Sequence, residues 1–267
     1  MKIDPFLKWA GGKRWLVSKH LEIFPRNFKR YVEPFLGSGA IFFALAPQKA
    51  LLSDSNKDLI ETYQAISDNW ENVYRYLLEH QQKHSEKYYY QVRDTAFAGR
   101  YARAARFIYL NRTCWNALYR VNRKGKFNVP IGTKTSVLLP SDDFAKIATR
   151  LSTATLIAAD FQVVIDRTKD GDLLYVDPPY TIKHGNNGFI KYNEHLFQWS
   201  DQERLKDALV RARRRGVFVI VSNACHSSIF DLYKGFEIFE LKRSSVLAAK
   251  SMSRGTYSEY LIVGAAK

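Results

Sequence analysis

Four consecutive residues, Asp177-Pro178-Pro179-Tyr180, combine groups that are suited to holding an amino group. They follow an apolar run at 173–176 that is typical of a buried strand, so they should lie at a strand's carboxyl end. The two prolines fix the backbone and have no amide hydrogen. The Asp177 carboxylate and the Pro178 carbonyl then remain as acceptors beside the flat ring of Tyr180. Such a site would bind both hydrogens of a nucleobase amino group and leave its lone pair free to attack, whereas a simple rigid turn would need neither the acid nor the tyrosine.

A second motif, Phe35-Leu36-Gly37-Ser38-Gly39, lies between a strand-like run and an apolar helical run. Glycines at this point let the backbone turn tightly and approach a ligand closely. The dinucleotide fingerprint needs a third glycine where this chain has Phe42, which disfavours a nicotinamide site. Asp54 follows at the end of the next expected strand. An acid there accepts hydrogen bonds from ribose hydroxyls or else caps the following helix, and the glycine loop before it favours the ribose.

Near the N-terminus, the segment from Trp9 to Lys13 reads Trp-Ala-Gly-Gly-Lys. It is not a phosphate-binding Walker loop, because Leu7 and Arg14 occupy the positions that need glycine and serine or threonine. Two interpretations remain: a turn that holds an indole and an amine beside an adenosine and a carboxylate, or a tryptophan that anchors the terminus to the core. The chain has two cysteines, which supply no disulfide framework and no metal quartet, so no metal site is expected.

The elements that would position these residues can be predicted from apolar runs bounded by Gly, Pro, Asp and Asn. Strands are predicted at 31–36, 50–53, 155–159, 173–176, 217–222, 236–241 and 259–263. Helical periodicity predicts helices over about 98–112 and over Trp199–Arg215, the latter opened by a capping box of Ser200 and Glu203. Alternating strands and helices predict an α/β fold with a largely parallel sheet, into which a basic helical segment is inserted.

Composition indicates a polyanionic partner. The 267 residues carry a net charge of +15. Ten of these charges lie in the aromatic-rich stretch 75–135, which has thirteen basic and three acidic residues. Basic groups neutralise phosphates and aromatic rings stack on bases, so nucleic acid is the simplest partner. The alternative is a helical lobe with an aromatic core and a solvated charged face. We expect a cytoplasmic protein, because no apolar run is long enough to span a membrane and no signal peptide is evident.

Taken in order along the whole chain, six motifs resemble the Dam-type (D12 class) site-specific DNA adenine-N6 methyltransferases. They are FLKWAGGK at 6–13, EPFLGSG at 33–39, SDSN at 53–56, LNRTCWNALYRVNRKGKFNVPIG at 110–132, ADF at 159–161 and DPPY at 177–180. The resemblance implies S-adenosylmethionine as methyl donor and double-stranded DNA as partner. It also implies a Rossmann-like catalytic domain over 1–60 and 140–267 and a target-recognition insertion over 61–139.

The resemblance also implies roles for individual residues. Asp177, Pro178 and Tyr180 hold and stack on the target adenine. The residues that bind the donor are Trp9, Lys13, Phe35, Gly37, Gly39, Asp54, Asp160, Phe161 and Asp177. The residues that read or wedge the DNA are Lys8, Asn116, Leu118, Arg120, Asn122 and Pro130. Phosphate contacts are expected from Arg112, Arg123, Lys124 and Lys126.

Several finer expectations follow from the same resemblance. The first candidate for the recognition sequence is GATC, although the family often has Asn-Gly-Leu where this chain has Asn116-Ala117-Leu118. A monomer and a cognate restriction endonuclease acting on the same site are expected. Alternatives on the same scaffold are transfer to cytosine N4 or to RNA. A DNA-binding module without catalysis is the alternative from a different class, and the intact catalytic motifs disfavour it.

Overall fold

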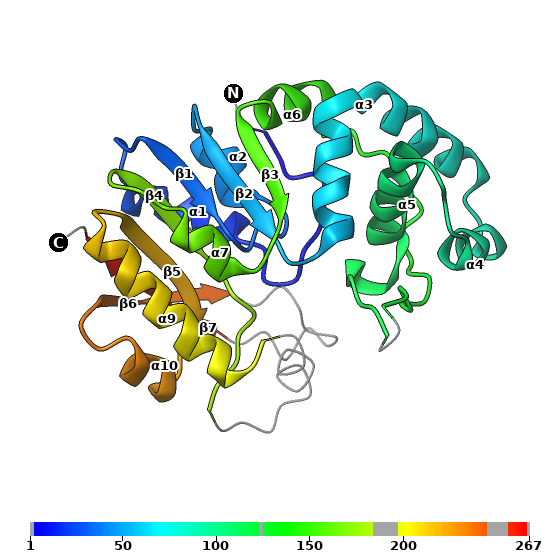
Figure 1. The fold of residues 1–267 in the computed structure, drawn as a ribbon. Helices are drawn as coiled ribbons and strands as arrows, with labels where there is room; N and C mark the ends of the chain where they lie inside the picture. The colour runs from blue at the N-terminus through cyan, green and yellow to red at the C-terminus, as the bar shows by residue number, and fades with distance from the viewer. Residues whose placement is uncertain (1–2, 123–124, 184–196, 245–255, 266–267) are drawn as a thin grey trace. The chain divides into compact units, whose positions relative to one another are not determined.

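The computed structural model describes residues 3–122, 125–183, 197–244 and 256–265. Within them, seven strands form one sheet with the order β3-β2-β1-β4-β5-β7-β6 (Figure 1). The strands are β1 (Arg30–Glu33), β2 (Ala50–Asp54), β3 (Ala154–Ala158), β4 (Asp172–Val176), β5 (Phe218–Ala224), β6 (Glu237–Ser244) and β7 (Thr256–Gly264).

Strand direction follows the predicted pattern only in part. β1 pairs in parallel with β2 and with β4, and β4 pairs in parallel with β5. β7 is antiparallel to both β5 and β6. The α/β Rossmann-like prediction is therefore confirmed, with an antiparallel pair added beside β5.

Helices occupy most of the connections. They are α1 (Arg14–His20), α2 (Ala40–Leu45), α3 (Lys57–Lys83), α4 (Glu86–Asp94), α5 (Arg100–Thr113), α6 (Phe144–Leu151), α7 (Phe161–Asp166), α9 (Trp199–Arg214) and α10 (Ser227–Leu232), with short 3-10 turns at Leu21–Ile23 and Trp115–Ala117. α3 begins where the Asn56 side chain accepts a hydrogen bond from the Leu59 amide at 3.1 Å. It bends at Asn69, which leaves the helical region of φ and ψ and whose side chain caps the second half of the helix.

The cap of α9 corrects a prediction. The helix begins at Trp199 as expected, but Ser200 and Glu203 do not form its capping box. Gln198 is the N-cap, and its backbone amide donates to the Asp201 carboxylate at 2.9 Å. The same spacing of a polar residue and an acid occurs two residues earlier than predicted, and Asp201 also suits the positive end of the helix dipole.

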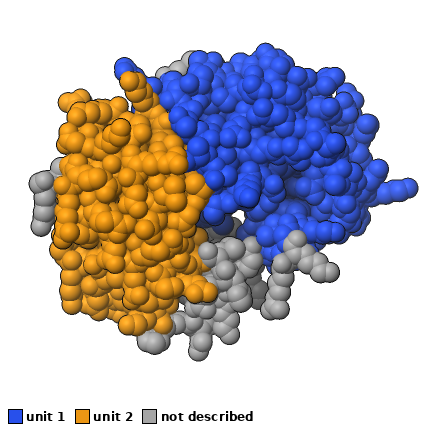
Figure 2. Space-filling model, in the orientation of Figure 1, with its two compact units in different colours: residues 1–21, 36–48, 54–158 blue, residues 22–35, 49–53, 159–267 orange. Residues whose placement is uncertain are grey.

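The chain packs as two units (Figure 2). Unit 1 comprises residues 1–21, 36–48 and 54–158, and unit 2 comprises residues 22–35, 49–53 and 159–267. In unit 1, α3 packs along α5 and α6. In unit 2, α7 and α9 lie side by side and α9 packs against β5 (Figure 1). The division predicted from the sequence, with an insertion over 61–139, stays a prediction.

Several aromatic side chains of the basic segment form the core of unit 1. Tyr89 and Tyr109 are fully buried. His80 stacks on Tyr109 with a centroid distance of 4.7 Å, and its Nδ1 lies 2.8 Å from the Tyr88 hydroxyl. For these residues the structure supports the alternative reading of an aromatic core, whereas Trp115, with 53% of its surface exposed, does not belong to it.

His80 should make the stability of the protein depend on pH. Burial, with smaller effects from Lys83 and Arg106, lowers the pKa of His80 from 6.5 to about 4. The unfolded chain then binds the proton more readily than the folded one. The free energy of unfolding should therefore fall as pH drops from 6.5 to 4, by roughly 3 kcal/mol.

Urea denaturation across this pH range measures the effect. A His80→Phe variant keeps a ring against Tyr109 but cannot be protonated, so its unfolding free energy should depend less steeply on pH. Equal slopes for variant and wild type between pH 6.5 and 4 would show that His80 does not titrate in this way.

Candidate functional site

The Asp177-to-Tyr180 motif lies where parallel strand order reverses. β1 and β4 are parallel neighbours, with Val32 opposite Leu174, and β2 and β5 flank them on either side. The segments that leave the carboxyl ends of β1 and β4 therefore emerge at the same edge of the sheet. These segments begin with Pro34-Phe35 and with Asp177. In open α/β sheets, ligands bind at this switch point.

Tyr180 is held by a buried acid. Its hydroxyl donates to Oε2 of Glu259 at 2.8 Å, and Glu259 lies on β7 with 4% of its surface exposed. Burial, followed by the charges of Asp177 and Glu259, raises the pKa of Tyr180 well above its usual range. The hydroxyl therefore stays protonated at neutral pH and acts as a donor. Asp177 and Tyr180 are both half-buried, so each keeps some surface for a ligand.

Three predicted donor-binding residues come together in unit 2. The rings of Phe35 and Phe161 stack at 5.4 Å between centroids, and Phe197 packs on both. Asp160 caps α7 by accepting a hydrogen bond from the Gln162 amide at 2.9 Å. The cluster thus joins an aromatic platform to an exposed carboxylate.

Arg204 of α9 completes this cluster and was not predicted. Both of its terminal nitrogens lie 3.0 Å from the oxygens of Asp160, and its guanidinium lies 4.3 Å from the centroid of Phe161. Arg204 is 44 residues from Asp160 in the sequence and belongs to no motif, so only the fold could have identified it.

Asp177 also belongs to unit 2, and the remaining predicted donor-binding residues lie in unit 1, around the glycine loop. The Asp54 carboxylate accepts hydrogen bonds from the Gly37 amide at 3.1 Å and from the Asn56 amide at 3.0 Å. Burial raises the pKa of Asp54, and these backbone hydrogen bonds oppose the shift. The Tyr63 hydroxyl donates to the Gly37 carbonyl at 3.0 Å. The backbones of Gly37 and Gly39 are both left-handed, with φ values of +49° and +65°. Asp54 is therefore part of the loop's own structure and still half-exposed to a ligand.

Trp9 borders this loop. Its indole stacks on Tyr119 at 5.6 Å between centroids and on Phe107 at 6.4 Å. Lys13 is buried, and its amine donates to the Gly11 carbonyl at 3.0 Å. The N-terminal segment thus packs within unit 1, as expected for a tryptophan that anchors the terminus to the core. A role of Trp9 and Lys13 beside an adenosine and a carboxylate stays a prediction.

A Gly37→Ala substitution should weaken donor binding. Gly37 has φ +49°, and an added Cβ would lie 2.7 Å from Cδ1 of Trp9. The left-handed backbone alone costs about 1–2 kcal/mol for alanine, and the clash would displace the indole. We expect the donor dissociation constant to rise at least ~10-fold, as measured by calorimetry.

Gly235→Ala is the matched control for Gly37→Ala. Gly235 also has a positive φ, +95°, but no atom lies within 4 Å of an added Cβ. It should share the backbone strain and leave donor affinity unchanged. Equal donor affinity of the two variants would contradict the role assigned to the glycine loop.

The predicted DNA-reading residues lie in unit 1, on the N-terminal segment and on the loop after α5. Asn111, fully buried in α5, accepts from the Lys8 amide at 3.0 Å and donates to the Lys8 carbonyl at 2.8 Å. The Lys8 side chain is exposed. Trp115 donates its amide to the Pro130 carbonyl at 2.9 Å, which closes the base of the loop.

Within this loop, residues 120–122 pair with residues 126–128. Val121 pairs with Phe127, and Nε of Arg120 donates to the Asn128 side chain at 3.1 Å. Arg120 and Leu118 are half-buried. The exposed predicted residues of the loop are Asn116, Asn122, Lys126 and Pro130. Arg123 and Lys124 lie outside the described residues.

A departure from the family pattern has a structural consequence. Asn116 and Ala117 both have positive φ, 54° and 52°. Asparagine tolerates this region, but alanine carries a strain of about 1–2 kcal/mol where glycine would carry little. The turn at Ala117 is therefore retained, and the strained alanine lowers the stability of the folded loop.

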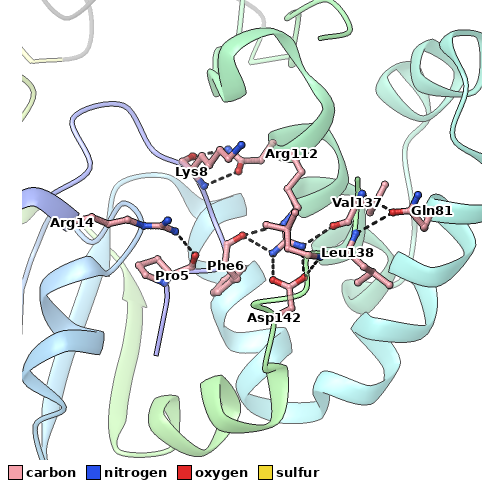
Figure 3. Close-up of polar contacts among 11 residues, drawn as sticks. Pro5, Phe6, Lys8, Arg14, Gln81, Arg112, Val137, Leu138 and Asp142 are labelled. Atoms are coloured by element: carbon pink, nitrogen blue, oxygen red, sulfur yellow. Dashed lines mark hydrogen bonds and ion pairs between the residues drawn. The ribbon is translucent and has the colours of Figure 1, made fainter. Parts of the chain in front are cut away.

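Arg112 corrects a prediction, because it is not available to phosphates. It is 2% exposed, and its guanidinium forms two hydrogen bonds with Asp142, at 2.5 and 2.7 Å (Figure 3). It also donates to the carbonyls of Val137 and Phe6. All of these partners belong to unit 1. Arg112 therefore ties the N-terminal segment and the segment 137–142 to α5.

The described residues hold no group of three or more His, Cys, Asp or Glu side chains placed to bind a metal ion.

Burial raises the pKa of Cys114 to about 11, so this thiol stays protonated at neutral pH. Among the described residues, no helix is both long enough and apolar enough to cross a membrane.

Known proteins are similar to this chain over most of its length. The model of the family described as D12 class N6 adenine-specific DNA methyltransferase matches residues 9–247. Type II methyltransferase M1.LlaDCHI of Lactococcus lactis subsp. cremoris is 36% identical over 271 residues, which cover 98% of this chain and 95% of that protein. Type II methyltransferase M.MjaIII of Methanocaldococcus jannaschii is 32% identical, with 95% and 96% covered. A DNA adenine methylase of Vibrio cholerae serotype O1 is 30% identical, with 96% and 94% covered.

Proposed function

The chain belongs to the D12 class of N6 adenine-specific DNA methyltransferases, and on that premise we propose how it holds and methylates an adenine of duplex DNA. S-adenosylmethionine is the methyl donor of this class, and DNA is the substrate. The single observation that carries the proposal is the position of Asp177-Pro178-Pro179-Tyr180 at the strand switch point, with Tyr180 fixed by Glu259.

The residues around the glycine loop fit this donor. A half-exposed carboxylate, Asp54, is suited to ribose hydroxyls, and the half-exposed indole of Trp9 offers a flat face. The close approach of Gly37 to Trp9 leaves no room for a side chain, as a loop that contacts a ligand through its backbone requires. Phe161 and Asp160 supply an aromatic surface and an acceptor for the adenine of the donor. When bound, the donor supplies an electrophilic methyl group on a sulfonium.

The target adenine should leave the duplex before it reacts. Its N6 amino group cannot be reached within the base stack, so we propose that the base flips out and stacks on Tyr180. The Asp177 carboxylate and the Pro178 carbonyl then accept the two amino hydrogens. These hydrogen bonds place the N6 lone pair toward the methyl group, and positioning of this kind supplies much of the rate. The proton leaves N6 for solvent after transfer.

DNA is held by the loop after α5 and by the N-terminal segment. We assign base contacts and wedging to Lys8, Asn116, Leu118, Arg120, Asn122 and Pro130, and a phosphate contact to Lys126. Trp115 adds an exposed ring next to Asn116, and an exposed ring among basic residues offers a stacking face for a base. GATC is the proposed recognition sequence. A monomeric enzyme and a cognate endonuclease for the same sequence belong to the same proposal.

An Arg120→Ala variant should lose sequence discrimination. The half-buried guanidinium is held by Asn128, so its direction is fixed as base reading requires. An arginine that grips guanine O6 and N7 contributes about 1–3 kcal/mol of discrimination. We expect the preference for GATC over a duplex with one altered base pair to fall by roughly 10-fold or more.

Competition binding with the two duplexes measures the preference, and Lys126→Ala is the control, because an exposed phosphate contact should weaken both duplexes equally. A uniform loss of affinity in Arg120→Ala would make Arg120 a phosphate contact instead.

Flipping itself is tested with 2-aminopurine in place of the target adenine. Its fluorescence should rise when the enzyme and a donor analogue bind a GATC duplex, and should not rise with a duplex whose bases are permuted. Unchanged fluorescence with the GATC duplex, at concentrations where the DNA is bound, would contradict the proposal.

A further inference from the structure

We propose that Glu259 is a positioning residue for methyl transfer, which acts by fixing the ring of Tyr180 and by keeping that ring electron-rich. The inference rests on the proposed function of Tyr180 as the residue that stacks on the flipped adenine. Glu259 lies 79 residues from Tyr180 in the sequence and in none of the motifs that mark the site.

Strand pairing brings Glu259 to the edge of the sheet that carries the catalytic motif. Glu259 on β7 lies opposite Ala224, the last residue of β5. β5 is parallel to β4, whose carboxyl end leads into Asp177. Because β7 runs antiparallel to β5, the first half of β7, which includes Glu259, lies at this edge of the sheet. The fold therefore places a carboxylate behind the catalytic motif from a different part of the chain.

The hydrogen bond between Tyr180 and Glu259 restrains the rotation of the Tyr180 ring, which must be fixed for the ring to stack on a base. A tyrosine side chain can swing about its first two torsions, and its face is useful for stacking only in one orientation. The 2.8 Å hydrogen bond from its hydroxyl to Glu259 fixes the far end of the ring. Glu259 is 4% exposed, so its own position is set by the surrounding sheet.

A carboxylate has a second effect that a neutral acceptor would lack. Hydrogen bonds to ionised acceptors are roughly twice as strong as neutral ones, and they push electron density onto the donor. During transfer, the N6 lone pair forms the new bond to carbon while the carbon–sulfur pair goes to sulfur. Positive charge therefore moves onto the base amino group, and an electron-rich ring face attracts it. Burial is the main cause that raises the pKa of the Tyr180 hydroxyl, and the nearby charges of Asp177 and Glu259 raise it further.

Glu259 is buried, and a buried carboxylate is an unfavourable choice if its only task is to hold the ring of Tyr180. Taking a carboxylate out of water is unfavourable unless hydrogen bonds and charges compensate it. A glutamine of the same shape would also accept the Tyr180 hydrogen bond. The Tyr180 hydrogen bond alone therefore does not require the charge of Glu259, and we assign that charge to the reaction.

The test compares Glu259→Gln, Glu259→Leu, Tyr180→Phe and the Tyr180→Phe/Glu259→Gln double variant in single-turnover methyl transfer to duplex DNA. Glu259→Gln keeps the acceptor and removes the charge, whereas Glu259→Leu removes both. We expect Glu259→Gln to lower the rate by about 10-fold with KM for DNA and donor nearly unchanged. Glu259→Leu should lower it further, and the double variant should be no slower than Tyr180→Phe alone.

Glu240→Gln is the matched control. Glu240 is an exposed acid on the neighbouring strand β6 and accepts a hydrogen bond from Ser258 at 2.6 Å. It should leave rate and KM unchanged. Thermal unfolding of every variant identifies those that lose rate through lost stability.

Two results would overturn the inference: a wild-type rate for Glu259→Gln, or effects of Tyr180→Phe and Glu259→Gln that add in the double variant. Tyr180→Ala separates this failure from failure of the proposed function. If Tyr180→Ala transfers methyl groups at the wild-type rate, the stacking role itself is wrong. If Tyr180→Ala is inactive and Glu259→Gln is unaffected, only the role of Glu259 is wrong.

Discussion

Replacing Asp177 with asparagine should lower the rate of methyl transfer by roughly 10²–10⁴-fold while DNA affinity stays close to that of the wild type. Asparagine has nearly the same shape, but its amide presents one acceptor and one donor where the carboxylate presents two acceptors. The amino group of the target base would then be held less firmly, and the negative charge that favours positive charge on N6 would be absent. Asp177 is half-buried at the strand switch point, so no large structural change is expected.

Single-turnover transfer of labelled methyl groups measures the rate, and fluorescence anisotropy with a labelled duplex measures DNA affinity. Asp207→Asn is the matched control, since the Asp207 side chain on α9 is 65% exposed. A wild-type rate for Asp177→Asn would remove Asp177 from the catalytic machinery. An equal loss of rate and of DNA affinity would assign Asp177 to DNA binding instead.

Replacing Arg112 with methionine should lower the free energy of unfolding by about 3–5 kcal/mol, because it leaves Asp142 buried without its partner. The two side chains are 2% and 8% exposed, so little water reaches the pair. The variant also leaves the carbonyls of Phe6 and Val137 without their donor. The N-terminal segment, which includes Lys8 and Trp9, would lose one of its attachments to α5.

Denaturant unfolding measures this loss. An Arg112→Met/Asp142→Leu double variant should recover part of it, since no buried charge is left unpaired. Lys29→Met is the control: it breaks the exposed Lys29–Asp170 pair, whose side chains are 71% and 76% exposed, and should cost at most about 1 kcal/mol. A loss below about 1 kcal/mol for Arg112→Met would mean that the buried pair contributes little to folding.

The strands of the fold were predictable because each is a short apolar run with a turn-forming boundary. The run at 173–176 lies within β4, and the run at 236–241 overlaps most of β6. Strand direction was not predictable in the same way. An apolar run looks alike in a parallel and an antiparallel pair, so the antiparallel β5–β7 and β6–β7 pairs were visible only in the structure.

The parts of the candidate site that lie in continuous motifs were also predictable, as the Asp177-to-Tyr180 sequence illustrates. Glu259 and Arg204 were not, because their partners are 79 and 44 residues away and no local pattern marks them. Arg112 was predicted wrongly for a related reason. A count of basic residues does not distinguish a solvated arginine from one whose partner, Asp142, lies 30 residues further along the chain.

Methyl transfer to defined nucleic acids followed by nucleoside analysis decides what the enzyme modifies. Labelled S-adenosylmethionine is incubated with the protein and duplex DNA that contains GATC, with permuted duplex DNA, or with RNA, and the product is digested to nucleosides. We predict label in N6-methyldeoxyadenosine from the GATC duplex only, and none with Asp177→Asn. Label in N4-methyldeoxycytidine or in RNA, or no label in any substrate, would contradict methylation of adenine N6 in DNA by this chain.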